Sequence, residues 1–433
     1  MTEAGSLGAV WRRALIGALA AVAVALYVAS ASASPGIQYG IQDDAWLQDG
    51  PGTLERRLDF VESLGVTTVR FGIHWDKVAP TRPARALASN DPAYRWGSLD
   101  AILQGVRARG IAPLVTIYGT APWANGGQKP NVAPTSPATF GDFAYAAAKR
   151  YPFVRKWTIW NEPNQRLSLA KTSPALYVKR LLNPAYAAIH RANPRALVGG
   201  GVTAPRGNTG GFGPIAWVRG MAAAHAKLDA YAHNPYATRP LVSPFGGACP
   251  YCDVISMANL NRLVKEVRRD FGSKPIWLTE YGYQTNPPDV FGVSPNSQAQ
   301  FVSESALRAY QLPGVTTLIQ FLVRDEPDLD RFQSGLFTVR GVAKPAYHAF
   351  RFPLAQVTRS GSRTSLWGQI RPGAGARPYR LQVRTGNSWR WLGSVQRTNG
   401  TGFISRTVTA PRGSVIRVWA PQQRAYGWPL LIR

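Results

Sequence analysis

The sequence is poor in cysteine, and this shortage excludes several kinds of site. Its 433 residues contain two cysteines, Cys249 and Cys252, separated by a proline and a tyrosine. A structural zinc site needs more ligands than this pair supplies, and a thioredoxin-like redox site needs a different surrounding fold. In an exported protein the pair is expected to form a local disulfide. We therefore predict no metal site and no cofactor.

Acidic residues are also scarce. The chain carries 23 Asp and Glu against 50 Lys and Arg, a formal net charge of +27, and residues 355–433 hold 13 Arg without one Asp, Glu or Lys. A surface this basic indicates an anionic neighbour, such as an acidic polysaccharide, a charged cell envelope or nucleic acid. Alternatively, because Arg outnumbers Lys 40 to 10, the surplus reflects genomic base composition acting on solvated positions.

Long apolar runs are confined to one place. Arg12 and Arg13 precede an unbroken apolar run of 16 residues, 14–29, which is followed by Ser30-Ala-Ser-Ala33. This three-part pattern predicts a signal peptide over residues 1–33. The alternative is an uncleaved anchor, but the run is short for a bilayer span. We expect a monomeric protein that is secreted or associated with the cell envelope, a location that makes nucleic acid an unexpected partner.

A glycine-rich phosphate-binding motif follows none of the strand-like runs, which argues against a doubly wound nucleotide-binding sheet. Strand-like and helix-like stretches alternate up to about Leu354, as in parallel βα units. The predicted strands are 36–41, 67–73, 111–118, 154–160, 196–202, 229–233, 275–279 and 316–322. The predicted helices include 54–64, 99–109, 177–191, 258–271 and 297–310. Eight strands with interleaved helices predict a (β/α)8 TIM barrel over residues 34–354.

The composition changes near Ala355. Short alternating runs such as 379–384 and 414–419 are separated by turn signals, which predicts a small C-terminal antiparallel β-sandwich over residues 355–433. Several tryptophans lie beside its arginines, and such rings can stack on sugars or bases. We expect this domain to dock on the barrel and to hold the protein near an anionic cell-envelope polymer.

Two glutamates each close an apolar, strand-like run. Glu162 ends the run 154–162, and Glu280 ends the run 274–280. A carboxylate at the exit of a buried strand is costly unless it is used. In a TIM barrel the C-terminal ends of the strands face the active site, and two convergent carboxylates are the minimal apparatus for cleaving a glycosidic bond. The alternative is that both are structural, ion-paired residues.

The ordered motifs resemble those of retaining glycoside hydrolases of clan A, in particular families 39 and 5, over roughly residues 36–350. Asn161-Glu162-Pro163 is similar to the clan's Asn-Glu-Pro at the end of strand four, and Trp277-Leu-Thr-Glu280-Tyr-Gly to the segment ending strand seven. The resemblance implies that Glu162 is the acid/base and Glu280 the nucleophile. It also implies that Arg70 supports the nucleophile, or else is a structural barrel arginine.

Further site residues follow from the same resemblance and from side-chain chemistry. His233 and Tyr236 match the His/Tyr pair after strand six, although His233 is alternatively a satisfied core histidine. Asn161 is placed to bond the sugar 2-hydroxyl, and Tyr236 or Tyr281 to donate to Glu280. The aromatic candidates for substrate binding are Trp75, Tyr118, Trp123 and Phe321, although most tryptophans in such a barrel are packing residues.

One segment departs from the clan's pattern. Clan members commonly present a Trp at the end of strand eight, whereas the run here is Ile319-Gln-Phe-Leu-Val-Arg-Asp325. Phe321 is nearest to that role, and Arg324 with Asp325 either replaces the missing contacts or forms a rim ion pair.

Together these features predict a secreted retaining glycoside hydrolase that cleaves O-glycosidic bonds of a carbohydrate by double displacement. The alternative is a catalytically weak carbohydrate- or anionic-polymer-binding envelope protein. Loss of either carboxylate or of Arg70 would favour that alternative, and all three residues are present.

Overall fold

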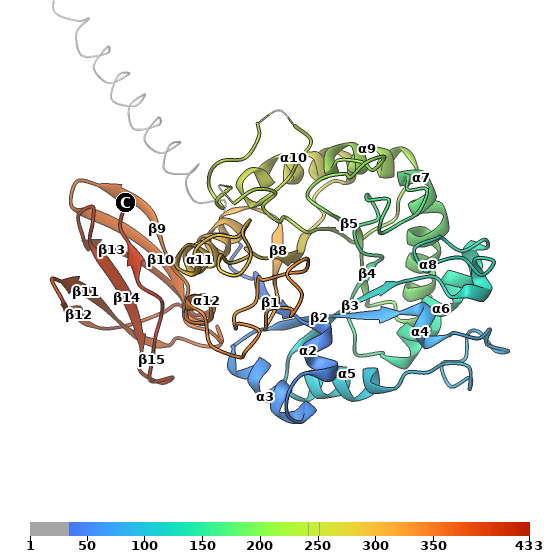
Figure 1. Ribbon diagram of the computed structural model, residues 1–433, viewed down its shortest axis with the longest axis horizontal. Helices are drawn as coiled ribbons and strands as arrows, with labels where there is room; N and C mark the ends of the chain where they lie inside the picture. The colour runs from blue at the N-terminus through green and yellow to red at the C-terminus, as the bar shows by residue number, and fades with distance from the viewer. Residues whose placement is uncertain (1–33, 241, 251) are drawn as a thin grey trace, which may run out of the picture.

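The computed structural model describes residues 34–240, 242–250 and 252–433, and its first part is a closed barrel of eight parallel strands in sequential order (Figure 1). The TIM-barrel prediction is confirmed, and each strand ends within two residues of its predicted bounds. The strands are β1 (Gln38–Gln42), β2 (Thr68–His74), β3 (Ala112–Tyr118), β4 (Lys156–Ile159), β5 (Leu197–Thr203), β6 (Ala230–His233), β7 (Ile276–Tyr281) and β8 (Val315–Phe321).

Side chains fill the barrel interior, so that the barrel is a packed core. Trp277 of β7 lies there with Leu114 of β3 and small residues of β5 and β6. The ammonium group of Lys156 lies 5.1 Å from the centre of the Trp277 ring and donates to Thr317 Oγ1 at 2.9 Å and to Gln38. Burial lowers the pKa of Lys156 to about 8.

Amphipathic helices form the outer layer. In α5, Leu99, Ile102, Leu103 and Val106 are buried, the spacing that places one helical stripe against the strands. The predicted helix 177–191 is a continuous run of α7, a π turn at Val178–Leu182, and α8. The helices are α2 (Asp44–Asp49), α3 (Leu54–Ser63), α4 (Trp75–Val78), α5 (Ser98–Ala108), α6 (Pro137–Arg150), α7 (Pro174–Tyr177), α8 (Asn183–Ala192), α9 (Pro214–Ala223), α10 (Leu260–Phe271), α11 (Pro295–Gln311) and α12 (Pro345–Arg351).

Two antiparallel sheets follow the barrel, and they confirm the predicted β-sandwich. One has the order β13-β10-β9; the other has the order β12-β11-β14-β15, with β16 paired to β14. Leu366, Leu381, Ile404, Ile416 and Val418 belong to a core of their own. The strands are β9 (Leu354–Ser360), β10 (Arg363–Gln369), β11 (Pro378–Thr385), β12 (Ser388–Arg397), β13 (Phe403–Thr409), β14 (Val415–Ala420), β15 (Ala425–Tyr426) and β16 (Leu430–Leu431).

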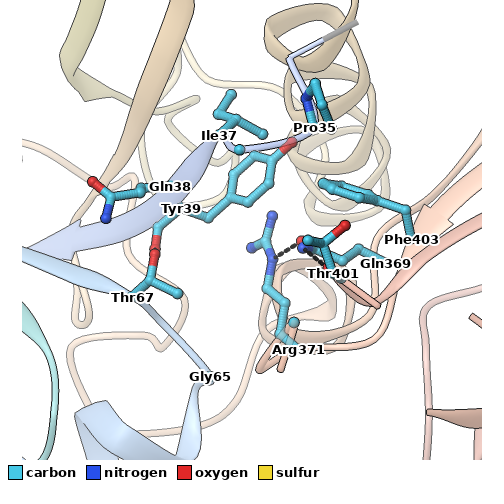
Figure 2. Close-up of a pocket in the computed structure, with 12 residues that line it drawn as sticks. Pro35, Ile37, Gln38, Tyr39, Gly65, Thr67, Gln369, Arg371, Thr401 and Phe403 are labelled. Carbon is cyan, nitrogen blue, oxygen red and sulfur yellow. Dashed lines mark hydrogen bonds between the residues drawn. The ribbon is translucent and has the colours of Figure 1, made fainter. Parts of the chain in front are cut away.

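A buried arginine joins the two domains (Figure 2). The guanidinium of Arg371 lies 4.0 Å from the centre of the Tyr39 ring, in β1, and 4.7 Å from that of Phe350. It donates to Gln369 Oε1 at 3.0 Å and to the Phe350 carbonyl at 2.6 Å. Only 3% of Arg371 is exposed, and burial lowers its pKa to about 10. The pocket drawn in Figure 2 therefore lies in the domain junction, near the N-terminal ends of β1 and β2.

An aromatic cluster completes this junction. Tyr310 of α11 packs on Phe403 and Trp367 of the sandwich, with ring centres 4.7 and 5.4 Å apart. The sandwich thus docks on the barrel, as predicted, and does so away from the C-terminal ends of the barrel strands. None of the helices in the described part of the chain has the length and apolarity needed to cross a membrane. The predicted signal peptide, residues 1–33, lies outside the described residues.

Candidate active site

The two glutamates lie at the C-terminal mouth of the barrel, Glu162 just after β4 and Glu280 within β7. The backbone around Glu162 is unusual, because Trp160, Glu162 and Val202 have φ angles of 67°, 50° and 46°. Residues other than glycine rarely adopt this left-handed backbone conformation, and β-branched residues such as valine do so least of all. The amide of Glu162 donates to the Val202 carbonyl at 2.9 Å. Backbone strain of this kind clusters at functional sites, and here it fixes where Glu162 leaves the strand.

Arg70 of β2 connects the polar groups of the mouth. It is 1% exposed and forms an ion pair with Glu280 through Nη1. Its Nη2 donates to Asn161 Oδ1 at 2.9 Å, its Nε to Thr116 Oγ1 at 2.9 Å, and its Nη1 also to Gln42 Oε1 at 2.7 Å. Charge-assisted bonds of this type favour the ionised carboxylate and fix its orientation. Arg70 therefore contacts both Glu280 and Asn161; its contact with Glu280 is the one expected from the sequence, whereas its bond to Asn161 was not.

Asn234 holds the other glutamate. Its Nδ2 donates to Glu162 Oε1 at 3.1 Å and lies 3.4 Å from Asn161 Oδ1. Its Oδ1 accepts a bond from the Thr279 hydroxyl at 2.7 Å, which sets the orientation of the amide. The sequence indicated the nearby His233 and Tyr236 as site residues but not Asn234 itself.

Tyr236 contacts the Glu280 oxygen that Arg70 does not bond. Its hydroxyl donates to Glu280 Oε2 at 3.2 Å. Burial, and then the charges of Glu280 and Glu162, raise the pKa of Tyr236 well above its usual value, so that the phenol remains a donor. Phe321 and Phe332 pack against the Tyr236 ring, with ring centres 6.3 and 5.5 Å away. Phe321 is thus adjacent to the site, and Phe332 is a neighbour that the sequence did not indicate.

His233 does not reach the substrate space. It is fully buried, with Nδ1 2.8 Å from Thr203 Oγ1 and Nε2 3.2 Å from the Ile255 carbonyl. Because a carbonyl only accepts, Nε2 carries the proton, and burial lowers the pKa of His233 to about 4. Both nitrogens are occupied by the protein, so the substrate-binding prediction for His233 is wrong and the core-histidine alternative holds.

Two aromatic predictions are also wrong. Trp75 is fully buried and packs against Phe140 and Phe143, with ring centres 5.6 Å apart in each pair. Tyr281 is 2% exposed within the main hydrophobic core. Because its ring is buried among the apolar residues of that core, Tyr281 does not border the mouth that Glu280 enters.

Trp123 and Tyr118 remain partly exposed. The Trp123 indole donates to the Ala79 carbonyl at 2.8 Å and packs edge-on against Trp75, and the Arg82 guanidinium lies over the ring, 5.9 Å from its centre. The Tyr118 hydroxyl forms a hydrogen bond with His74 Nε2. Burial raises the pKa of Tyr118, and the charges of Asp44, Arg70 and Glu280 also affect that pKa, so this tyrosine borders the site.

A further carboxylate, which the sequence did not indicate as a site residue, lies beside Tyr118. Asp44 Oδ2 accepts from the Gly72 amide at 3.1 Å. Burial raises the pKa of Asp44 to about 7, while the Arg70 charge opposes this rise. Asp44 comes shortly after the end of β1, and Glu280 lies near the end of β7. The pattern that pointed to the two glutamates, a carboxylate at the end of a buried strand, could therefore have identified Asp44 as well.

The two glutamates differ in their electrostatic surroundings. Burial, followed by the charge of Glu280, raises the pKa of Glu162 to about 7, against the opposing effects of Asn234 and Arg70. Glu280 is instead paired with a guanidinium. A carboxyl whose pKa is raised by burial, beside a carboxylate paired with a guanidinium, is an arrangement found where acid and base roles are divided between two carboxyls. The site can therefore supply a proton and a carboxylate nucleophile together.

Arg324 and Asp325, at the rim of the barrel after β8, do not pair with each other as considered from the sequence. Asp325 pairs with Lys344 Nζ at 2.7 Å, in a buried contact, while Arg324 Nε donates to the Val339 carbonyl at 2.7 Å. Arg324 and Asp325 therefore do not form the rim ion pair considered from the sequence. They stabilise the loop after β8.

The loop between β6 and α10 contains the disulfide predicted between Cys249 and Cys252, whose Cα atoms are 5.8 Å apart. Both cysteines line a small pocket together with Arg206 and Arg239. Within the described residues, no group of three or more His, Cys, Asp or Glu side chains is placed to hold a metal ion.

The structure resembles solved glycoside hydrolases. A family 39 glycoside hydrolase from the gut symbiont Bacteroides cellulosilyticus WH2 matches with a TM-score of 0.59 and 17% identity, over 86% of this chain and 80% of that chain. The GH39 enzyme from Xanthomonas axonopodis pv. citri matches with a TM-score of 0.56 and 15% identity, over 90% and 94% of the two chains.

An exo-beta-1,4-mannosidase, Op5Man5 from Opitutaceae bacterium strain TAV5, has a TM-score of 0.51 and 19% identity, over 72% of this chain and 58% of that chain. No protein-family model and no curated protein matches the sequence. Because sequence identity to these solved structures is low, the similarity establishes only the fold of this protein. That fold is the one predicted from the resemblance of the sequence motifs.

Proposed function

We propose that this protein is an exported retaining glycoside hydrolase, which cleaves O-glycosidic bonds of a carbohydrate by double displacement. The observation that carries the proposal is the pairing of two carboxyls at the barrel mouth. Glu280 is ion-paired with Arg70, and burial, followed by the charge of Glu280, raises the pKa of Glu162 to about 7. A proton donor beside a carboxylate nucleophile is what this reaction requires.

In the first step, a Glu280 oxygen attacks the anomeric carbon while the Glu162 proton passes to the glycosidic oxygen. The bond between the anomeric carbon and that oxygen breaks, the aglycone leaves as an alcohol, and the sugar is left as an ester of Glu280. Esterification removes the negative charge of Glu280. Since that charge contributes to the raised pKa of Glu162, Glu162 becomes a stronger acid and is left ionised.

In the second step, Glu162 accepts a proton from water and the resulting hydroxide attacks the anomeric carbon. The ester bond breaks, Glu280 returns to its ionised form, and the sugar leaves with its original anomeric configuration after two inversions. Both carboxyls thereby regain their starting protonation states without any external acid.

The neighbouring residues stabilise these charges. Arg70 and Tyr236 bond the two Glu280 oxygens, which aims the carboxylate and accommodates the growing ester. Asn161 is held by Arg70 and is proposed to bond the sugar 2-hydroxyl, a contact that strengthens in the transition state. Asn234 donates to Glu162 Oε1 and is proposed to orient this carboxyl toward the leaving oxygen.

A panel of aryl glycosides and polysaccharides tests the proposal. The unmodified protein should hydrolyse at least one of them, and Glu280→Ala should abolish that activity. Azide should restore it and give a glycosyl azide of inverted configuration, because the small anion enters the space of the missing carboxylate. Glu62→Ala, which removes an exposed carboxylate from α3, is the matched control and should retain full activity. Full activity in Glu280→Ala would contradict the proposal.

A further inference from the structure

One sheet of the C-terminal domain exposes an ordered array of arginines and aromatic rings. In β11, Leu381 belongs to the core of the sandwich and Val383 packs against that core. Alternation along the strand therefore directs Arg380, Gln382 and Arg384 to the opposite, outer face.

The neighbouring strands follow the same rule. Arg417 of β14 pairs with Gln382, Trp419 pairs with Arg380, and Trp391 of β12 pairs with Gln382. Directly paired residues share a face of the sheet. The resulting surface, here called the arginine–aromatic face, consists of Arg380, Arg384, Trp389, Trp391, Arg417, Trp419 and Tyr426. Gln382 lies on the same side of the sheet and is itself buried.

Two arginines of this face are held rigidly by aromatic rings. The Arg417 guanidinium lies between Trp389 and Tyr426, 4.1 and 3.8 Å from the ring centres. The Arg380 guanidinium lies 4.3 Å from the centre of the Trp391 ring. Stacking of this kind fixes the plane of the guanidinium.

The hydrogen bonds leave the outer edges of both groups free. Arg417 Nε donates to Gln382 Oε1 at 2.9 Å, and Arg380 Nε donates to the Gly393 carbonyl at 2.8 Å. Among the described residues, the Nη groups of these two arginines have no hydrogen-bond acceptor. Each therefore presents a pre-oriented fork of the kind that binds carboxylates through two parallel bonds.

The positive charge of the face is not neutralised by the protein. Residues 355–433 contain no acidic residue, and none of their arginines forms an ion pair with a described residue of the barrel. Arg384 is exposed, and Trp391 is 42% exposed. The charge is thus available to an external anion.

We propose that the arginine–aromatic face binds an anionic polysaccharide, whose uronic acid carboxylates are received by Arg380, Arg417 and Arg384. These arginines form a zigzag row across β11 and β14, and the row extends about 13 Å along the strands. A row of cations matches a polymer with repeated carboxylates better than a single small anion. The proposal deepens the proposed function, since an enzyme bound to such a polymer meets its glycosidic bonds at a raised local concentration.

The stacking geometry favours a glycan over nucleic acid. Single-stranded nucleic acids bind proteins largely by stacking bases on open aromatic faces. Here guanidinium groups already cover faces of Trp389, Trp391 and Tyr426. The surface instead offers N–H groups and indole edges, which suit carboxylates and hydroxyls.

Retention of the full-length protein on immobilised polygalacturonate at low salt tests the proposal, with the fully methyl-esterified polymer as the neutral control. Arg380→Gln/Arg417→Gln should weaken binding about tenfold or more, because two bidentate contacts are lost. Arg359→Gln/Arg363→Gln removes the same charge from the other sheet and should change binding less than about twofold. Arg380→Lys/Arg417→Lys keeps the charge and loses the fork, so it should give an intermediate loss.

Three results would overturn the proposal. The first is an equal loss of binding in the two double glutamine variants, and the second is equal binding of the unmodified protein to the esterified polymer. The third is binding to single-stranded DNA or to anionic lipid vesicles that depends on Arg380 and Arg417 and is stronger than binding to polygalacturonate. Hydrolysis of a small neutral aryl glycoside is measured in parallel and should be unchanged in every variant. Absence of hydrolysis in the unmodified protein would refute the proposed function and leave the binding result standing. Matching thermal unfolding curves ensure that the variants are folded.

Discussion

The raised pKa of Glu162 leads to a prediction about pH dependence. Burial and the Glu280 charge raise that pKa from an ordinary value of 4.5 to about 7. A carboxyl group with this raised pKa keeps its proton when the pH is below about 7 and loses it when the pH is higher. At pH 9, two units above the pKa, roughly 1% of Glu162 is protonated, so kcat/KM for a glycoside with a poor leaving group should fall about 100-fold from its plateau.

The perturbation is Glu162→Gln, which cannot donate a proton at any pH. Hydrolysis of a glycoside with a poor leaving group should be lost. A 2,4-dinitrophenyl glycoside needs no protonation, so its first step should proceed in the variant, without the limb of the profile near pH 7. The assay is kcat/KM for both substrates between pH 5 and pH 9. The reasoning is refuted if the unmodified enzyme shows no decline above pH 7, or if the variant keeps the same decline.

Three further predictions follow from single contacts. Arg70→Met should lower the free energy of unfolding by about 3–5 kcal/mol at neutral pH, because it leaves a buried carboxylate unpaired; urea unfolding measures this, and a loss below about 1 kcal/mol would contradict it. The bond from Asn234 lowers the pKa of Glu162, so Asn234→Ala should move the basic limb of the pH profile to higher pH, and an unmoved or lowered limb would count against the contact. Arg371→Met should destabilise the domain junction by about 1–3 kcal/mol, since it removes hydrogen bonds in a buried place; calorimetry would show an earlier transition, and an unchanged one would exclude this role.

Local patterns were sufficient to predict the barrel and the position of Glu162 and Glu280 at its C-terminal mouth. Buried strands that end in carboxylates are a strong signal, since burial of a charge is tolerated only where it is paired or used. The same signal was present for Asp44, which follows β1. The sandwich was predicted from its alternating runs and turn residues, which depend only on neighbours in sequence.

The errors concern which way a side chain points. His233 and Asn234 are adjacent at the end of β6, and only Asn234 contacts Glu162. Glu280 and Tyr281 are adjacent in β7, where the strand register is irregular between Leu278 and Tyr281, so simple alternation along the strand does not predict which of the two faces the substrate. Contacts such as that of Arg371 with Tyr39 join residues from opposite ends of the chain, and no local pattern indicates them.

The anomeric configuration of the first product is the most direct test of double displacement. Proton NMR of a freshly mixed reaction separates the two anomers of the released sugar before they interconvert by mutarotation. The proposed roles of Glu162 and Glu280 predict that the sugar appears first in the configuration of the substrate. A product that appears first with the inverted configuration would contradict the assignment of Glu280 as nucleophile.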